Sequence, residues 1–211
     1  MDKTKLAVEV FNSCAKEYHD KFMELDLYND TFDLFCDSIK KKNADILEVA
    51  CGPGNITKYL LKNRADFKIL GIDLATDMIT LATINNPTAE FQLMDCRCIS
   101  RIEKKFDAIM CGFCLPYLSK EEAIQFIKDA STLLTAGGIF YISTMEGDYS
   151  TSGLKKSSSG MHECYIHYHQ EDYLTEALEQ NGFAIIDLHR KNFLLHDSAA
   201  TIDLIIIACK Y

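Results

Sequence analysis

Hydrophobic residues in this chain gather in short runs that have the length of buried β-strands. The runs are rich in Ile, Leu, Val and Phe and are bounded by polar residues or glycine. Because most of them alternate with helical segments, the pattern predicts an α/β domain built on a mostly parallel sheet. They occupy positions 46–49, 67–72, 90–93, 106–111, 139–144, 183–188 and 201–209.

Apolar residues at three- and four-residue intervals predict helices between these strands. The clearest helix follows Ser119, which forms a capping-box pattern with Glu122, and we expect Gly137 and Gly138 to end it. A second helix is predicted over 170–180. The same spacing in the first 43 residues predicts a helical lead-in with the apolar positions Phe11, Ala15, Tyr18, Phe22 and Leu25.

The strand at 46–49 leads into a glycine turn and then into a helix that begins near Asn55. Gly52 and Gly54 permit backbone torsions closed to other residues and let a ligand approach the main chain. The free amides of the following helix favour an anionic group such as a carboxylate or phosphate. A dinucleotide fingerprint needs a third glycine where Thr57 stands, so that ligand class is disfavoured. A purely structural turn is the alternative.

Asp73 ends the second predicted strand, roughly twenty residues beyond the glycines. A carboxylate at this place can accept hydrogen bonds from both ribose hydroxyls of an adenosine group, and it would repel a 2′-phosphate. Alternatively Asp73 caps the next helix, although Thr76 is equally suited to that role.

The motif Glu48-Val49-Ala50-Cys51-Gly52-Pro53-Gly54 resembles the first motif of the class I S-adenosylmethionine-dependent methyltransferases. Further likeness follows in register: FNSCAKEYHDKF, FDAIMCGFCLPYLS, LLTAGGIFYISTME and EALEQNGFAIIDL resemble segments of small-molecule enzymes of this family. The resemblance implies a Rossmann-like fold with a seven-stranded, mostly parallel sheet, an antiparallel last strand and helices on both faces. It implies S-adenosylmethionine as cofactor, with these binding residues: Phe11, Tyr18, Glu48, Ala50, Gly52, Gly54, Asp73, Leu74, Met78, Asp95, Cys96, Cys111 and Phe113.

On the same resemblance, Asp95 would accept a hydrogen bond from the adenine amino group, and the backbone N–H of Cys96 would meet a ring nitrogen. We interpret the chain as one methyltransferase domain with four consecutive parts. They are an N-terminal helical lid segment (1–43), a cofactor-binding core (44–145), a substrate-side loop and strand (146–169) and a closing helix and hairpin (170–211).

The chain departs from its relatives after the fourth strand, where many of them carry a histidine near the positions of Pro116 and Tyr117. A general base for the acceptor must therefore come from elsewhere. His167 is the first candidate by position, followed by His169 and Tyr149.

Several histidines and a cysteine lie close together in the segment 162–169. His162, Cys164, His167 and His169 are all metal-ligand types, but their spacing matches no zinc pattern, and we expect no metal. Instead these side chains are expected to line the acceptor pocket or to be exposed polar residues.

Cys111 and Cys114 have C-x-x-C spacing, yet a redox centre of that kind opens a helix in a thioredoxin-like unit. The resemblance to the methyltransferases already explains the segment that contains Cys111 and Cys114.

The composition of the chain disfavours some classes of binding partner. The formal net charge is −9, which disfavours nucleic acid as a substrate. No signal-peptide pattern or membrane-length apolar stretch is present, so we expect a cytoplasmic protein without a membrane partner, with its nine cysteines reduced.

The expected activity is methyl transfer to a small-molecule O, N or S acceptor by in-line displacement. The alternatives are a non-catalytic S-adenosylmethionine-binding or regulatory protein and a nucleotide-dependent oxidoreductase. The acceptor and the oligomeric state are not predicted.

Overall fold

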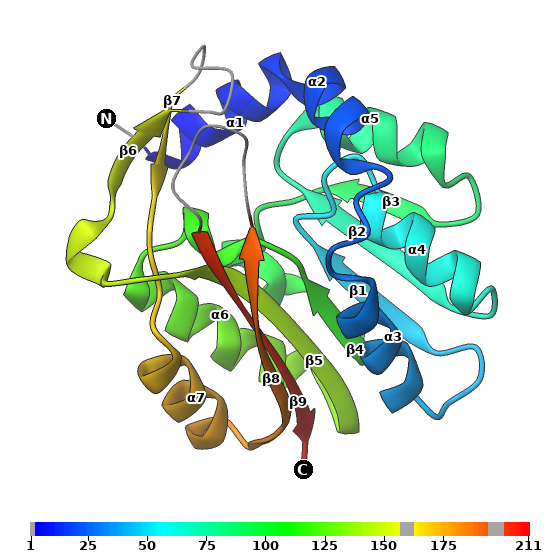
Figure 1. Ribbon diagram of the computed structural model, residues 1–211. Helices are drawn as coiled ribbons and strands as arrows, with labels where there is room; N and C mark the ends of the chain where they lie inside the picture. The colour runs from blue at the N-terminus through cyan, green and yellow to red at the C-terminus, as the bar shows by residue number, and fades with distance from the viewer. Residues whose placement is uncertain (1–2, 157–162, 194–200) are drawn as a thin grey trace.

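A seven-stranded sheet forms the centre of the fold (Figure 1). The computed structural model describes residues 3–156, 163–193 and 201–211. The strand order is β3-β2-β1-β4-β5-β9-β8, which confirms the predicted sheet. The strands are β1 (Asp45–Val49), β2 (Lys68–Asp73), β3 (Glu90–Leu93), β4 (Phe106–Cys111), β5 (Leu134–Glu146), β8 (Phe183–Phe193) and β9 (Thr201–Lys210).

The first five strands of this sheet run parallel, whereas β9 runs antiparallel to both β5 and β8. Strand β1 pairs with β2 on one side and with β4 on the other, so the winding direction of the sheet reverses between β1 and β4. Ligands of open α/β sheets bind at the carboxyl ends of the strands beside such a reversal.

Helices cover both faces of the sheet. On one face, α6 (Lys120–Leu133) and α7 (Glu171–Gln180) bury Phe126, Ile127 and Leu174 against the strands. On the other face, α3 (Asn29–Ser38) and α4 (Asn55–Asn63) bury Phe35 and Leu60. Strand residues alternate between these two cores, because successive side chains of a strand point to opposite faces.

The N-terminal helices lie beyond the carboxyl ends of the strands (Figure 1). Helices α1 (Lys3–Ser13) and α2 (Ala15–Phe22) pack against α5 (Thr76–Asn85), where Ala15, Ala75 and Met78 form a small core. Helix α1 also contacts β7 (Glu163–Ile166), which pairs with β6 (Gly153–Lys156) in a separate two-stranded sheet. Residues 3–43 thus contain the helices α1, α2 and α3, and the first two cover the edge where the ligand is expected.

The prediction that Gly137 and Gly138 end the long helix is wrong. Helix α6 ends at Leu133, and β5 begins at the next residue. The pairing of β4 with β5 shifts register between Phe106 and Ala108, whose partners are Leu134 and Ile139. Gly137, at φ 76°, lies within this irregular stretch, so its left-handed backbone serves a bulge in the strand.

Two other predicted boundaries differ from the structure. The segment 146–169, interpreted as a substrate-side loop and strand, contains a short 3₁₀ turn η3 (Tyr149–Thr151) and two strands, β6 and β7, while 157–162 lie outside the described residues. Strand β8 extends to Phe193 instead of ending near residue 188. Its polar second half continues because every residue from Asp187 to Phe193 has a partner in β9. Within the described part of the chain, no helix is long and apolar enough to cross a membrane.

Candidate functional site

The glycine turn after β1 adopts backbone angles that few side chains tolerate. Ala50, Gly52 and Gly54 all have positive φ, at 55°, 53° and 80°. A Cβ on Gly54 would lie 2.4 Å from the Asn86 side-chain nitrogen and 3.2 Å from the Ala82 Cα. Gly54 is therefore required where α5 packs against the turn, and it is not among the residues that line the cleft described next.

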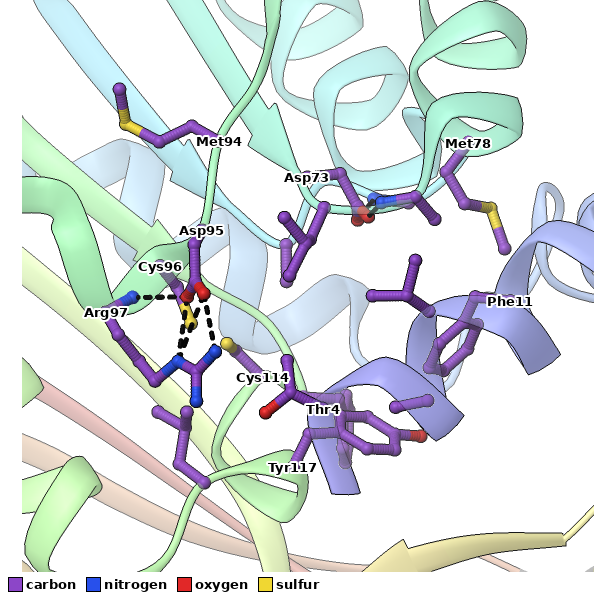
Figure 2. Close-up of a pocket in the computed structure, with 18 of the residues that line it drawn as sticks. Thr4, Phe11, Asp73, Met78, Met94, Asp95, Cys96, Arg97, Cys114 and Tyr117 are labelled. Carbon is purple, nitrogen blue, oxygen red and sulfur yellow. Dashed lines mark hydrogen bonds and ion pairs between the residues drawn. The ribbon is translucent and has the colours of Figure 1, made fainter. Parts of the chain in front are cut away.

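A cleft opens over the carboxyl ends of β1, β2 and β4, beneath α1 and α2 (Figure 2). Its empty volume, counted together with the open solvent at its mouth, is about 880 Å³. Apolar and aromatic side chains dominate the lining, with Asp73 and Asp95 as its acidic groups. The lining residues are Thr4, Ala7, Val8, Phe11, Tyr18, Ala50, Gly52, Asp73, Leu74, Ala75, Met78, Met94, Asp95, Cys96, Arg97, Gly112, Phe113, Cys114, Tyr117 and Leu118.

Ten of the predicted cofactor-binding residues therefore lie together on one cleft: Phe11, Tyr18, Ala50, Gly52, Asp73, Leu74, Met78, Asp95, Cys96 and Phe113. They come from segments as far apart in sequence as α1 and the loop after β4. Glu48, Gly54 and Cys111 do not line it.

Asp73 is held at the floor of the cleft by main-chain donors. The Gly52 amide donates to one carboxylate oxygen at 2.9 Å, and the Ala75 amide donates to the other at 2.8 Å. Burial raises the pKa of Asp73, while these amides oppose the rise. Asp73 thus ties the turn after β1 to the start of α5. Thr76 lies inside α5 and makes no side-chain cap.

Asp95 lies on another wall of the cleft, where Arg97 grips it (Figure 2). The Arg97 guanidinium donates to the Asp95 carboxylate at 2.6, 3.0 and 3.1 Å and to Glu122 at 3.1 Å. The Arg97 amide donates to the same carboxylate, because Asp95 caps the 3₁₀ helix η1 (Cys96–Arg101). Although burial opposes it, the bonds to Arg97 lower the pKa of Asp95, so this carboxylate stays an acceptor.

Aromatic rings close the side of the cleft beneath the N-terminal helices. The Phe11 ring meets the rings of Tyr18 and Tyr117 edge-on, with centroids 5.9 and 5.1 Å apart. Burial, together with the nearby Asp73 carboxylate, raises the pKa of Tyr18 to about 12. Its phenol therefore stays protonated and can donate a hydrogen bond.

Glu48 is buried beneath the glycine turn, on the α4 side of the sheet. One carboxylate oxygen accepts a hydrogen bond of 2.5 Å from the Thr57 hydroxyl in the first turn of α4. The other oxygen has no partner among the described residues. Burial raises the pKa of Glu48 to about 8. An orphaned buried carboxylate oxygen beside a ligand-binding turn indicates a missing hydrogen-bond donor.

The three predicted catalytic residues lie together, but none of them lines the cleft. His167 packs its ring against Tyr149, with centroids 5.7 Å apart, and both pack near His169. The His169 ring is bonded on both nitrogens, to the Tyr173 hydroxyl and, at 2.8 Å, to the Leu115 carbonyl. Burial lowers the pKa of His169 to about 4.

These three residues buttress the loop after β4. That loop contains the 3₁₀ turn η2 (Leu115–Tyr117), which includes the two positions near which the resemblance led us to expect a histidine. The His167 amide donates to the Pro116 carbonyl at 2.8 Å, and the His169 ring contacts Leu115. Tyr149 accepts from the Lys120 amide at 3.2 Å. His167 Nδ1 is buried without a partner among the described residues.

Metal and redox chemistry find no further support in the cysteines and histidines. His162 lies outside the described residues, and among those that are described no three His, Cys, Asp or Glu side chains are grouped to hold a metal ion. All nine cysteines are free thiols. The hydrogen bond that the Cys114 thiol donates to Cys111, together with burial, raises the pKa of Cys114 well above its usual value, which disfavours the reactive thiolate.

Sequence reasoning missed Arg97 and the α1 residues Thr4, Ala7 and Val8 as lining residues. The nearness of Arg97 to Asp95 in sequence was the available signal, since residues two apart meet readily in a tight capping turn. The α1 residues carry no such signal, because their side chains are those of an ordinary amphipathic helix.

The sequence of this chain is similar to those of known methyltransferases. Residues 46–138 match a family described as a methyltransferase domain. The chain is 31% identical over 100 residues to a methyltransferase of Invertebrate iridescent virus 6, covering 47% of this chain and 37% of that protein. It is 30% identical over 113 residues to an uncharacterized methyltransferase of Alkaliphilus oremlandii, covering 53% and 50%. The chain thus matches half or less of the length of these relatives.

Solved structures share the whole fold. Magnesium protoporphyrin IX methyltransferase from Synechocystis PCC 6803, solved with bound S-adenosylmethionine, superposes with a TM-score of 0.76 at 15% identity, covering 100% of this chain and 98% of that one. The 1,6-didemethyltoxoflavin-N1-methyltransferase of Burkholderia thailandensis gives 0.71 at 19% identity, covering 98% and 88%. With this strand order the chain has the fold of these methyltransferases, and residues 46–138 are the part that matches the methyltransferase-domain family.

Proposed function

We propose that this protein transfers the methyl group of S-adenosylmethionine to an O, N or S atom of a small molecule. The observation that carries the proposal is the pairing of Gly52 and Asp73, whose 2.9 Å hydrogen bond joins the ends of adjacent parallel strands at the floor of the cleft. This place lies beside the reversal of strand order, where α/β sheets bind nucleotide-like ligands.

The residues present suit the chemistry of the cofactor. Asp73 keeps lone pairs beyond its donors Gly52 and Ala75, because a carboxylate accepts about four hydrogen bonds, so it can accept from ribose hydroxyls. Asp95 already accepts four hydrogen bonds from Arg97, so it accepts from the adenine amino group only where that group replaces one of them. The orphaned Glu48 oxygen suits a donor such as the ligand's ammonium group, directly or through water.

When bound, S-adenosylmethionine supplies a methyl group activated by a positively charged sulfur. The chain must align the acceptor with that methyl and keep water away, since a poorly hydrated nucleophile attacks faster. Phe11, Tyr117 and Leu118 provide an apolar wall for this purpose. Phe113 lies on the sheet side of the same cleft.

In this proposal His167, His169 and Tyr149 hold η2 in place behind that wall. Both ring nitrogens of His169 are bonded within the protein, so it positions the loop and leaves proton transfer to other groups. His167 is the member of the trio whose ring nitrogen keeps a free bonding position.

A small-molecule acceptor is favoured by the net charge of the chain and by the compounds for which two structural neighbours are named. The net charge of −9 opposes a polyanionic substrate. The Synechocystis and Burkholderia proteins are named for a metalloporphyrin and a didemethyltoxoflavin, both small molecules.

The test is calorimetric titration of the purified protein with S-adenosylmethionine and S-adenosylhomocysteine, with NAD as the control ligand. We expect micromolar binding of the first two and none of NAD. Asp73→Ala should abolish this binding, whereas Asp77→Ala, an exposed acid in the first turn of α5, should leave it unchanged.

Turnover is then measured as S-adenosylhomocysteine formed with a panel of phenols, amines and thiols. Cofactor binding without product for any acceptor would favour a non-catalytic binding protein. A folded protein that binds neither cofactor form would overturn the proposal.

A further inference from the structure

A buried acid on β9 is not explained by the fold or by the cofactor site. Asp203 is only 2% exposed, and one of its carboxylate oxygens has no partner among the described residues. The other oxygen accepts a hydrogen bond of 2.6 Å from the Tyr28 hydroxyl. Burying a carboxylate with incomplete bonding costs free energy, so a position of this kind indicates a function or a missing partner.

The surroundings of Asp203 are apolar on the α3 side of the sheet. Ile205 and Ile207, two and four residues further along β9, lie in the core that α3 and α4 cover, and alternation places Asp203 on the same face. Thr201 shares this face, and its hydroxyl oxygen is also buried without a partner among the described residues. Two orphaned polar atoms thus lie at the end of β9 nearest the carboxyl end of β5.

This polar spot adjoins the cleft through one aromatic ring. Phe113 lines the cleft, and its ring centroid lies 5.2 Å from that of Tyr28. The Phe113 amide donates to the Ser143 hydroxyl at 3.0 Å, which fixes the loop after β4 to β5. Phe113 has φ 57°, so its ring is held at this place by a backbone angle that is uncommon for a large side chain.

We propose that Asp203 and Tyr28 form the polar end of the acceptor site, where the Asp203 carboxylate binds the N–H or O–H of an aromatic acceptor. This inference rests on the proposed methyl transfer and adds the class of acceptor to it. The rings of Phe113 and Tyr28 provide flat apolar surfaces for an aromatic body, and the free carboxylate oxygen accepts from its polar group.

The charge balance of the transfer agrees with this role. The lone pair of the acceptor nitrogen or oxygen forms the new bond to the methyl carbon, and the carbon–sulfur bond breaks with its electrons remaining on sulfur. The proton leaves the acceptor for the free oxygen of Asp203 and then passes to solvent. Burial raises the pKa of Asp203 to about 6, so at neutral pH the group is ionised and basic enough to take part.

Charged and titratable groups lie near Asp203 on several elements. Tyr28 precedes α3, Asp30 lies in its first turn, Tyr141 comes from β5 and Lys191 from β8, where it stands opposite Asp203. Lys191 forms its ion pair with Asp30. It therefore leaves the Asp203 oxygen free for a ligand.

The test uses fluorine NMR on protein saturated with S-adenosylhomocysteine. The probes are 4-fluorophenol and 4-fluoroaniline, with 4-fluoroanisole as the matched ligand that has no donor hydrogen. We expect at least one donor probe to bind more tightly than the anisole. Asp203→Asn should weaken that probe about tenfold, because a charge-assisted hydrogen bond is lost, and should change anisole binding less than twofold.

The same titrations include two other variants. Tyr28→Phe should weaken the donor probe several-fold, since it frees the carboxylate from its orienting partner, and it also reports on the pair if Asp203→Asn fails to fold. Asp187→Asn, which alters an acid on β8 that is not buried, should behave as the wild type. S-adenosylhomocysteine affinity should stay the same in all three variants.

The outcomes separate the two proposals. Failure of the wild type to bind S-adenosylhomocysteine would refute the proposed function. Binding of S-adenosylhomocysteine with no preference for the donor probes, or with a preference that survives both Asp203→Asn and Tyr28→Phe, would overturn only the assignment of Asp203 and Tyr28.

Discussion

Arg97 grips the Asp95 carboxylate through hydrogen bonds of 2.6, 3.0 and 3.1 Å and reaches Glu122 with its remaining nitrogen. Glu122 belongs to the capping box that begins α6. One side chain therefore couples the expected adenine site to a core helix.

Loss of the hydrogen bonds between Arg97 and Asp95 should weaken cofactor binding. We expect Arg97→Gln to raise the dissociation constant of S-adenosylhomocysteine about tenfold, because Asp95 would no longer be held in one orientation. The analogue S-inosylhomocysteine, which carries a carbonyl in place of the 6-amino group, should lose much less. Arg101→Gln, at an exposed position of the same 3₁₀ helix, is the control. Equal losses for both ligands would show that Arg97 does not act through Asp95.

Gly54 and Gly137 provide a matched pair for stability, since both have φ near 80°. Gly54→Ala should lower the free energy of unfolding by at least about 3 kcal/mol, because a Cβ there meets Asn86 at 2.4 Å and adds overpacking to backbone strain. A Cβ at position 137 would meet nothing within 4 Å, so Gly137→Ala should lower the free energy of unfolding by only about 1–2 kcal/mol, through backbone strain. Urea unfolding measures both, and similar losses would contradict the packing role of Gly54.

Ala50 occupies a left-handed position within the cofactor turn. Ala50→Val should lower the free energy of unfolding by about 2 kcal/mol or more, because a β-branched side chain is strongly disfavoured at φ 55°. Ala50→Gly should be tolerated within about 1 kcal/mol, since strain relief and added chain entropy oppose each other. As a control, Ala184→Val places the same change on an exposed position of β8 and should have little effect in thermal unfolding.

Glu48 should make stability depend on pH. Its folded pKa of about 8 lies above the ordinary value of 4.5, so the folded state binds the proton more tightly. Its contribution is complete below pH 4.5 and is lost as pH rises through about 8, at no more than about 1.4 kcal/mol per pH unit. We expect Glu48→Gln to lack this decline, as measured by urea unfolding between pH 5 and 9. Parallel curves for the two proteins would show that Glu48 ionises normally.

Substitution of His169 should lower the free energy of unfolding more than substitution of His167. His169→Phe should lower the free energy of unfolding by about 1–3 kcal/mol, because the Leu115 carbonyl loses its buried donor. His167→Gln should cost less, since His167 Nδ1 makes no bond that can be lost. If S-adenosylhomocysteine formation with the best acceptor falls a hundredfold in His167→Gln while cofactor binding persists, His167 and not Asp203 serves as the base.

Local patterns predicted most of the fold and the cofactor side of the cleft. The strand at 46–49, the turn at Gly52 and the acid at Asp73 are neighbours in space because each ends or follows a parallel strand, and strand ends can be read from hydrophobic runs. The seven-stranded sheet and its closing antiparallel hairpin came from the resemblance as a whole.

What the sequence did not reveal depends on contacts between distant residues. Tyr28 and Asp203 are 175 residues apart, and neither belongs to a motif. The bulge that employs Gly137 depends on pairing between β4 and β5, while glycine alone is equally typical of a helix end. His169 is buried outside the cleft, where its ring is bonded to the Leu115 carbonyl, and no spacing rule indicates this contact.

The insertion of β9 between β5 and β8 has a consequence for how the chain folds during synthesis. Strand β8 leaves the ribosome before β9, yet it reaches the sheet only through β9. Until residues 201–210 emerge, β5 remains an unpaired edge, which is a site for aggregation. Docking of this hairpin also delivers Asp203 to Tyr28, so the acceptor end of the site is assembled last, after the cofactor end has formed.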